Sequence, residues 1–331
     1  MSRIAFARAL GFFSLAATTL AAGSARAQEP PPAAVAAPVA PAQRQYTRQT
    51  YPASLVDRPL VLPKWVFQPT VDVGISNSKA GTGESFGIGF DVGVARKLQI
   101  GAMFELPVGP AADFGLLAFN LQTPLGRSAN LRFDVGVQRG SFHLDDDSIH
   151  TDGFVMGVGL PIKVKLHRML AFISGSTAAR GFAGGPVIAG DSDRKQMTYG
   201  VFAPLGNDLF SLAVLPGSHE TGALVNETLV TGTMFLPMGL LVQPHDRISF
   251  AVRTGYRLTF AHADGGGSDY IGHYVPLAFD VVVNPIRQLD IGFTALIQGY
   301  VGDNIAHSAG TTPAPGWADQ RQFNIWIGGR I

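Results

Sequence analysis

The 331-residue sequence contains no cysteine. This absence excludes disulfide bonds, thiolate metal sites and cysteine nucleophiles. Charged residues are also scarce, at 15% of the chain, whereas 46% of the residues are hydrophobic and the formal net charge is only +1. With no excess of basic residues, the sequence predicts no nucleic-acid partner. So high an apolar content with so little charge is unusual for a water-soluble protein.

Long hydrophobic runs are missing from most of the chain, and only the N-terminus approaches one. There, Arg3 and Arg8 precede an apolar run over residues 9–22, and the small residues of "ARA" follow. This order is typical of a secretory signal peptide, so we expect residues 1–27 to be cleaved and the protein to be exported. A retained helical anchor is the alternative, although the run is shorter than the roughly 20 residues that span a bilayer.

A segment rich in proline and alanine follows the leader. Residues 28–45 read "QEPPPAAVAAPVAPAQRQ", a composition that favours an extended, semi-rigid spacer over a packed core. Together with the next stretch it forms an expected periplasmic segment over residues 28–63. We expect ordered structure to start near Lys64.

From Lys64 onward, large apolar residues alternate with small or polar ones. In "FGIGFDVGV", residues 86–94, every second position is large and apolar, and the positions between hold only glycine and aspartate. Successive residues of a strand face opposite sides of a sheet, so each such stretch predicts a strand with one apolar face. The alternation recurs over residues 67–75, 98–106, 131–138, 154–166, 248–260, 275–283, 289–298 and 322–331, and less regularly over 113–122, 168–178 and 228–243. The pattern predicts about twelve antiparallel strands.

The expected connections between these strands alternate in length. The short links fall at residues 94–97, 124–130, 166–168, 243–247 and 284–288, and the longer loops at 77–84, 107–112, 143–152, 179–226, 262–268 and 302–319. Short turns at one end and longer loops at the other are typical of transmembrane β-barrels. A sheet in hydrocarbon must close on itself to pair its backbone groups, so we expect the apolar face to meet lipid and the small polar face to line a lumen.

In its leader, dyad repeat and alternation of turn length, the chain resembles the Gram-negative outer-membrane β-barrel proteins over residues 64–331. The pattern is porin-like and assigns no subfamily, and the chain departs from a common feature of the class by ending in Ile331 instead of an aromatic residue. The resemblance implies an all-β, antiparallel transmembrane barrel in the outer membrane of a Gram-negative bacterium. It implies contact with outer-membrane lipid and lipopolysaccharide, insertion by the barrel assembly machinery, and no cofactor.

Aromatic residues near the expected strand ends fit girdles at the two membrane interfaces. They are Trp65, Phe67, Tyr256, Phe260, Tyr270, Tyr274 and Tyr300.

The parity of the strands also predicts which charged residues face the lumen. The acidic candidates are Asp72, Asp91, Glu105, Asp134, Asp280 and Asp290, and the basic candidates are Arg132, Lys163, Lys165, Arg253, Arg257 and Arg330. One interpretation is a basic ladder opposite a wall of carboxylates, with a transverse field acting on solutes. The other is a set of salt bridges that hold the wall together. Because the two signs are equal in number, the sequence does not indicate which ions the lumen would favour.

The longest expected loop, residues 179–226, leaves several interpretations open. Loops of this length are uncommon without a function, so it could constrict the barrel as a lid or present an outer binding surface. It could also hide a pair of strands within residues 197–215, which would give fourteen strands in all.

Two weaker candidates for chemistry lie in the expected loops. Residues 143–152 gather possible metal ligands, His143, Asp145, Asp147 and His150, but a solvated acidic loop is the favoured interpretation. Ser218 and His219 are neighbours in sequence, which does not by itself make a nucleophile and base. The sequence has no Gly-x-Ser-x-Gly, P-loop or His-Glu-x-x-His motif.

The function that these features favour is passive passage of small solutes through a charge-lined lumen. The alternative is a non-conducting barrel whose outer loops bind a ligand or partner. An outer-membrane lipid hydrolase is less favoured, and no enzymatic activity is expected.

Overall fold

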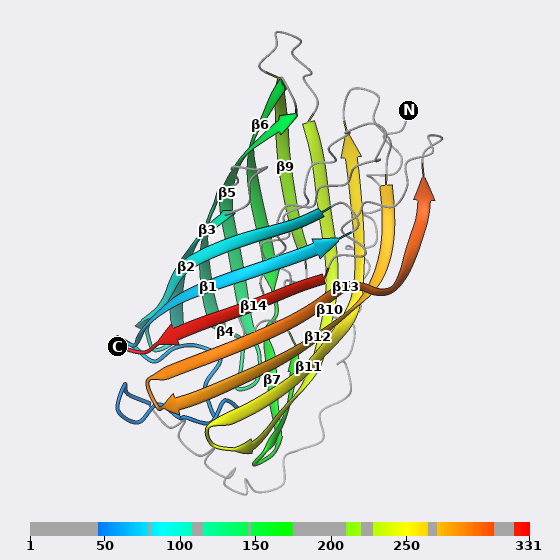
Figure 1. Cartoon of the computed structure of the whole chain (residues 1–331). Coiled ribbons are helices and arrows are strands. Elements are labelled where there is room, and N and C mark those ends of the chain that lie inside the picture. Colours follow the sequence, from blue (N-terminus) through cyan, green and yellow to red (C-terminus); the bar gives the residue numbers. More distant parts are fainter. Residues whose placement is uncertain are drawn as a thin grey trace, which may run out of the picture. The chain divides into compact units, whose positions relative to one another are not determined.

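The computed structural model describes residues 46–331 except for 79–80, 108–114, 145–146, 175–209, 220–227, 264–269 and 308–320. The expected signal peptide and the proline-rich stretch up to residue 45 lie outside the described residues. Within the described part of the chain, no helix has the length and apolarity needed to cross a membrane. The secondary structure there consists of antiparallel strands (Figure 1).

Fourteen strand segments are assigned within the described residues. They are β1 (Phe67–Ser78), β2 (Gly81–Ala95), β3 (Leu98–Pro107), β4 (Gly115–Pro124), β5 (Asn130–Leu144), β6 (Asp147–Gly159), β7 (Ile162–His167), β8 (Leu170–Ser174), β9 (Phe210–His219), β10 (Thr228–His245), β11 (Ile248–Ala263), β12 (Tyr270–Ile286), β13 (Leu289–His307) and β14 (Arg321–Gly329).

The pairing of these strands runs in a complete circuit. The hydrogen-bonded order is β11-β12-β13-β14-β1-β2-β3-β4-β5-β6-β9-β10, and β10 pairs in turn with β11. The first and last strands, β1 and β14, are antiparallel neighbours. The all-β, antiparallel barrel predicted from the sequence is therefore confirmed.

The fourteen described segments occupy twelve positions around this circuit. Strand β7 continues the line of β6, because β5 pairs with β6 as far as Gly159 and the preceding residue Ala129 bridges to Ile162. Strands β8 and β9 share the next position, since both pair with β10, β8 at its C-terminal half and β9 at its N-terminal half. The predicted number of about twelve strands therefore agrees with the twelve positions around the described circuit. The number fourteen counts the described strand segments, of which two pairs share a position.

A proline interrupts the line of β6 and β7. Pro161 has no N–H to donate to a ladder, which is why a strand ends before it. Its carbonyl still accepts from the backbone N–H of Asn130 at 2.9 Å, and the next ladder bond runs from Lys163 N to Ser128 O at 2.8 Å. The predicted strand over residues 154–166 is present, with a break at Leu160–Pro161.

The expectation that residues 179–226 form one long loop is wrong in part. Strand β9 lies inside that range and completes the position that β8 begins. Within 197–215 the described residues belong to the single strand β9, which lies between β6 and β10, and residues 197–209 lie outside the described residues. Of the predicted strand over 168–178, β8 covers Leu170–Ser174. Residues 175–209 lie outside the described residues.

The side chains on the two faces of the strands differ in exposure as the alternation of the sequence predicts, with the apolar ones exposed and the polar ones buried. On β14, Phe323 is 46% exposed and Ile325 is 58% exposed, whereas Gln322 and Asn324, which alternate with them, are only 2–3% exposed. A water-soluble protein buries its large apolar side chains and exposes its polar ones, and here the arrangement is inverted. The inversion fits a barrel whose outer face meets hydrocarbon.

The short turns gather at one end of the barrel, which we call the short-turn end. Two residues separate β2 from β3, β7 from β8, β10 from β11, and β12 from β13. The termini of the sheet meet there too, because Phe67 and Ile331 exchange backbone hydrogen bonds of 3.1 and 2.8 Å. The short connections predicted at this end are present, but the alternation in length is incomplete, because only two residues also join β1 to β2 and β5 to β6.

Three of the expected long loops are shorter than predicted. Strands β5 and β6 enclose only residues 145–146, so most of 143–152 is a hairpin; β1 and β2 enclose only 79–80. Strand β13 runs on to His307, inside the expected loop 302–319. The reason is that polar residues do not stop a strand whose backbone stays paired beyond the apolar stretch.

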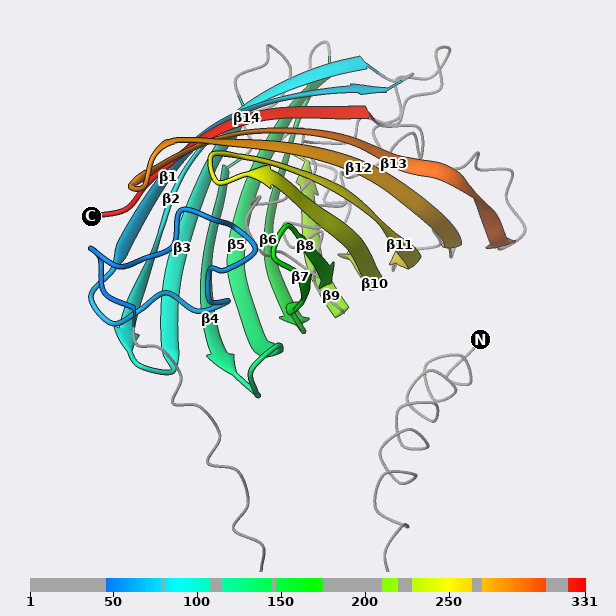
Figure 2. The ribbon, with the colours of Figure 1, turned by 90° about the horizontal axis from the view of Figure 1, so that it is seen from below.

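The chain is already folded before Lys64, which corrects the expected start of ordered structure. Residues 46–66, here called the N-terminal segment, bury Tyr51, Leu55 and Leu62 to 5% exposure or less. In Figures 1 and 2 the segment (blue) lies at the end of the sheet where β14 finishes. It carries neither a period of two nor a helical period, so the sequence pattern gave no sign of its order.

Candidate functional site

The N-terminal segment meets the inner side of the barrel at the short-turn end. On β3, the Gln99 Oε1 accepts a hydrogen bond of 2.8 Å from the backbone N–H of Leu62. On β4, the Gln122 Nε2 donates to the carbonyl of Leu60 at 2.6 Å. Both glutamines lie on the inward parity of their strands and are buried. The segment is therefore bound by side chains that would otherwise face the lumen.

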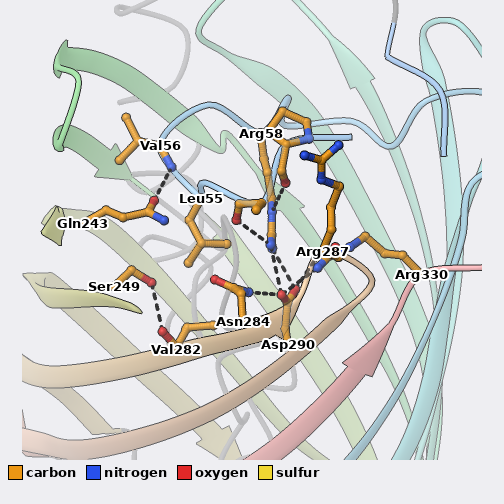
Figure 3. Close-up of polar contacts among 12 residues, drawn as sticks. Leu55, Val56, Arg58, Gln243, Ser249, Val282, Asn284, Arg287, Asp290 and Arg330 are labelled. Carbon is orange, nitrogen blue, oxygen red and sulfur yellow. Dashed lines mark hydrogen bonds and ion pairs between the residues drawn. The ribbon is translucent and has the colours of Figure 1, made fainter. Parts of the chain in front are cut away.

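The opposite side of the segment binds β10 through one glutamine. Gln243 Oε1 accepts from the backbone N–H of Val56 at 3.2 Å (Figure 3) and also from the hydroxyl of Ser54 at 3.1 Å. The Gln243 Nε2 donates to the carbonyl of Asp246 in the next turn, at 3.0 Å. Because its own turn holds Gln243, the amide presents its oxygen to the segment in a fixed direction.

The centre of the contact is a carboxylate held by two guanidinium groups, which we call the Asp290 cluster. Arg58 of the segment donates two hydrogen bonds to Asp290, at 2.7 and 2.9 Å. Arg330, which follows β14, donates two more at 2.6 and 2.7 Å, and Asn284 Nδ2 also donates to Asp290 (Figure 3). Asp290 is 1% exposed. Bidentate pairs of this kind are among the stronger polar contacts in proteins.

Tyr51 contacts both arginines of the Asp290 cluster through its ring. The Arg58 guanidinium carbon is 5.7 Å from the centre of its ring, and that of Arg330 is 5.3 Å away, which are cation–π distances. Burial raises the pKa of the Tyr51 phenol above its ordinary value of 10.0, although the two nearby guanidinium charges oppose the rise. The phenol is therefore neutral at physiological pH.

Two lysines of β7 bind the middle of the segment. Lys163 Nζ donates to the carbonyl of Leu55 at 2.9 Å and also to the carbonyl of Arg58. Lys165 forms an ion pair with Asp57, and both of these side chains are exposed, at 47% and 41%. Lys163 is a partly buried anchor for the backbone of the segment, whereas the Lys165–Asp57 pair is open to solvent and contributes little stability.

An apolar cluster completes the contact. Leu55 and Val56 of the segment belong to it, together with six inward residues of the barrel, namely Ala171, Ile173, Leu241, Ala251, Val282 and Trp326. The Trp326 indole lies over Gly292 on the neighbouring strand, where any Cβ would overlap the ring. Glycine at 292 therefore makes room for a large inward side chain on β14.

Further along the lumen, predicted charges pair on the wall itself. Arg132 Nε is 2.7 Å from Asp134 on the same strand. Arg253 Nε is 2.5 Å from Asp280 on the neighbouring strand, and the hydroxyl of Thr294 donates to the same carboxylate at 2.8 Å. These pairs are the local salt bridges of the second sequence interpretation, and no continuous ladder facing a carboxylate wall is formed by them.

The remaining acidic candidates, Asp72, Asp91 and Glu105, lie buried on the inner side of β1, β2 and β3. Asn120 of β4 donates to Asp91 at 3.4 Å. Their inward position agrees with the parity, and their role in selectivity stays a prediction.

Arg257 of β11 lies on a different part of the wall, with its guanidinium carbon 4.7 Å from the centre of the Phe235 ring. Tyr274, its partner in the register of β12, is only 2% exposed. The expectation that Tyr274 belongs to an interfacial girdle is therefore wrong, because its position has the inward parity. Tyr256 and Tyr300 are exposed, as a girdle requires.

The residues that join the segment to the barrel were mostly missed in the sequence. Inward parity alone could have identified Gln99 and Gln122 as lumen residues. Arg58 had no such signal, because it stands in "LVDRPLVLP" with no repeat around it. Its partner is 232 residues away in the chain, and only the closed sheet brings the two together.

The weak metal and hydrolase candidates take positions in strands. His143 lies in β5 opposite Ser148, and His150 lies in β6 opposite Ser141; Asp147 begins β6, and Asp145 lies outside the described residues. Ser218 and His219 are consecutive residues of β9. Among the residues that the structure describes, no group of three or more His, Asp or Glu side chains could hold a metal ion.

Comparison with known proteins gives a likeness in fold only. No protein-family model matches the chain, and no curated protein sequence matches it. Solved structures of outer-membrane barrels do match. The COG4313 outer membrane channel from Pseudomonas putida F1 is 10% identical with a TM-score of 0.45, over 83% of this chain and 98% of that one. The translocator domain of the autotransporter NalP from Neisseria meningitidis is 12% identical with a TM-score of 0.42, over 80% and 87%. The NanC porin is 8% identical with a TM-score of 0.36, over 80% and 100%.

Proposed function

We propose that this chain is an outer-membrane channel of a Gram-negative bacterium that passes small polar solutes through the barrel lumen. The observation that carries the proposal is the inversion of the two faces, with apolar residues exposed outside and charged or amide side chains buried inside. A polar interior replaces part of the hydration shell of a solute, while an apolar interior would exclude it.

The inward polar face extends along the strands and is not confined to one spot. Asp290 and Thr294 follow one another along β13, and Gln322 and Asn324 continue on β14, all of them buried. A polar row on the inner side of neighbouring strands is typical of the interior of an outer-membrane barrel.

The proposal includes the route of the protein to the membrane. Residues 1–27 would direct export and be removed, and the barrel assembly machinery would insert the mature chain among outer-membrane lipid and lipopolysaccharide. The leader supports this route through its positive residues, apolar run and small cleavage residues.

Single-channel conductance in planar bilayers tests the proposal on the chain that starts at Gln28. We expect discrete conductance steps in symmetric salt. In a salt gradient, Arg253→Gln should shift the reversal potential, because it removes a positive charge beside Asp280 in the lumen. Val252→Leu, the neighbouring outward position, is the matched control and should leave the potential unchanged.

The occupied short-turn end favours the alternative, a barrel that does not conduct. That alternative predicts folded, inserted barrels without steps, both in the wild type and in variants that loosen the N-terminal segment. Absence of steps in all of these would refute the channel.

A further inference from the structure

We infer that the N-terminal segment is a releasable plug, held at the short-turn end by the Asp290 cluster, and that its release opens the lumen to solutes. The inference rests on the proposed channel function. It concerns residues 46–62 as the moving part, because residues 64–66 are joined to β2 by the backbone. Trp65 N donates to Gly93 O at 2.6 Å, and Gly93 N donates to Val66 O at 3.0 Å.

The barrel wall is complete without the plug. All twelve positions of the described circuit pair with each other, and residues 46–62 contribute no strand to it. The described hydrogen bonds from the barrel to these residues come from side chains, chiefly Gln99, Gln122, Lys163 and Gln243. Removing the plug therefore breaks no ladder and exposes polar side chains that water can satisfy.

The central carboxylate stays paired when the plug leaves. Asp290 keeps both hydrogen bonds from Arg330 and the one from Asn284 after Arg58 has gone. Stranding a buried charge is what usually makes the breaking of a buried ion pair prohibitive. Here the barrel holds a second guanidinium for the same carboxylate, so release leaves no unpaired carboxylate in the wall.

The plug also keeps much of its own structure when it moves. Arg58 donates to the carbonyls of Pro52 and Ala53 within the segment, at 3.0 and 2.9 Å. Tyr46, Tyr51 and Leu62 pack in a separate apolar cluster, from which only Val66 stays behind on the barrel. Only Leu55 and Val56 would leave the shared apolar cluster, whose other six members are on the barrel.

The junction with the barrel has the backbone of a hinge. Trp65 has φ of 66°, and it is the one non-glycine residue of the described chain with a positive φ. The left-handed region is unfavourable for a residue with a Cβ, so the docked path of the chain is strained at this point. Straightening at Trp65 would relieve the strain and release the bond from Trp65 N to Gly93 O as residues 46–62 swing away, while Val66 stays bonded to Gly93.

Thiol labelling measures the release directly, because the native chain has no cysteine. Val56→Cys places a thiol at a position that is 3% exposed, and Arg48→Cys provides an exposed reference on the same segment. A water-soluble maleimide is added to the folded protein in lipid vesicles. We expect slow labelling at 56 and rapid labelling at 48.

Arg58→Ala should raise the labelling rate of Val56→Cys about tenfold to a hundredfold, because two charge-assisted hydrogen bonds to Asp290 are lost. Arg132→Ala is the matched control, since it removes an arginine from another ion pair of the lumen wall without touching the plug. It should leave the labelling rate at 56 unchanged. Arg58→Ala should also increase the time that the channel spends open.

A covalent lock provides the opposite test and does not depend on a destabilised variant. A carbodiimide can join the paired carboxyl of Asp57 and amine of Lys165 as an amide, with the lost oxygen leaving as a urea. Wild-type channels whose cross-link is verified by mass spectrometry should open less. Lys165→Arg keeps the charge but cannot form the amide, and its conductance should not respond.

The outcomes separate the plug from the channel. The plug would be overturned if Val56→Cys were labelled slowly even in Arg58→Ala and if the conductance steps of this variant equalled those of the wild type. The wild-type conductance would also have to be the same before and after cross-linking. The channel itself would stand in that case. Fast labelling with no steps in any variant would support a mobile segment but refute the channel on which the plug depends.

Discussion

The barrel wall and the N-terminal segment obtain their order in different ways. The wall repeats one local rule, an apolar residue at every second position, and each strand is fixed by the backbone of its two neighbours. The N-terminal segment repeats nothing and is fixed by side chains of strands that are distant in the sequence, such as β3, β4, β10 and β13. The comparison teaches that a barrel can organise a segment that has no regular structure of its own.

The strongest test of this contrast is at the residue that joins both regions. Asp290→Ala leaves two buried guanidinium groups, Arg58 and Arg330, without their carboxylate. We expect a loss of about 3 to 5 kcal/mol in stability, the usual cost of an unpaired buried charge. Urea unfolding of the barrel in vesicles measures it. Arg58→Ala, which removes one arginine and leaves the Asp290–Arg330 pair, should cost clearly less, and an equal cost would contradict the account.

The next effect tests the wall alone. Ile325→Lys places a charge on the outer face of β14, where the side chain is 58% exposed. If that face meets hydrocarbon, the barrel should lose about 2 to 4 kcal/mol of stability near the bilayer midplane. The control is Asn324→Thr, the inward neighbour, which keeps a polar side chain in the lumen. Equal stability of Ile325→Lys and wild type in vesicles would mean that the outer face does not meet lipid.

A smaller effect should separate the segment from the wall. A Cβ at Gly93 would overlap the carbonyl groups of Leu62 and Pro63, so Gly93→Ala should push the end of the segment away from β2. Overpacking of this kind costs about 1 to 3 kcal/mol, and we expect faster labelling of Val56→Cys with little change in urea stability of the barrel. Gly126→Ala is the control, because nothing lies within 4 Å of a Cβ there. A fall in barrel stability without faster labelling would show that the two regions are not separable.

The smallest expected effect sharpens the contrast at the junction. Trp65→Gly removes the cost of a left-handed residue, about 1 kcal/mol, and should slow the labelling of Val56→Cys about fivefold by favouring the docked segment. Trp65→Ala removes the same indole but keeps a Cβ at φ 66°, so it should not slow the labelling. The two variants would label alike if the backbone at Trp65 held no strain.

The repetitive part of the fold could be predicted from the sequence because its rule is local. The stretch 86–94 shows its two faces in its own letters, and the structure exposes Ile88 and Phe90 while it buries Asp91. The same parity placed Asp134, Asp280 and Asp290 inside. The same parity places Tyr274 inward, but the girdle prediction considered only that it is an aromatic residue near a strand end.

The errors arose where strand structure depends on a partner and not on the segment's own pattern. Strand β9 has little alternation in "FSLAVLPGSH", and it is a strand because β6 and β10 leave a position open beyond the end of β8. The hairpin of β5 and β6 likewise extends through polar residues because each backbone continues to pair with the other. Pairing of this kind cannot be read from one segment alone.

The sequence by itself determined the kind of protein. Its dyad repeat settled which residues face outward and which face inward, because a strand side chain has only two directions available. The tertiary structure alone decided what those inward residues bind. Pairing of β13 with β14 brings Asp290 and Arg330 together, and closure of the sheet between β1 and β14 adds Arg58 from the opposite end of the chain.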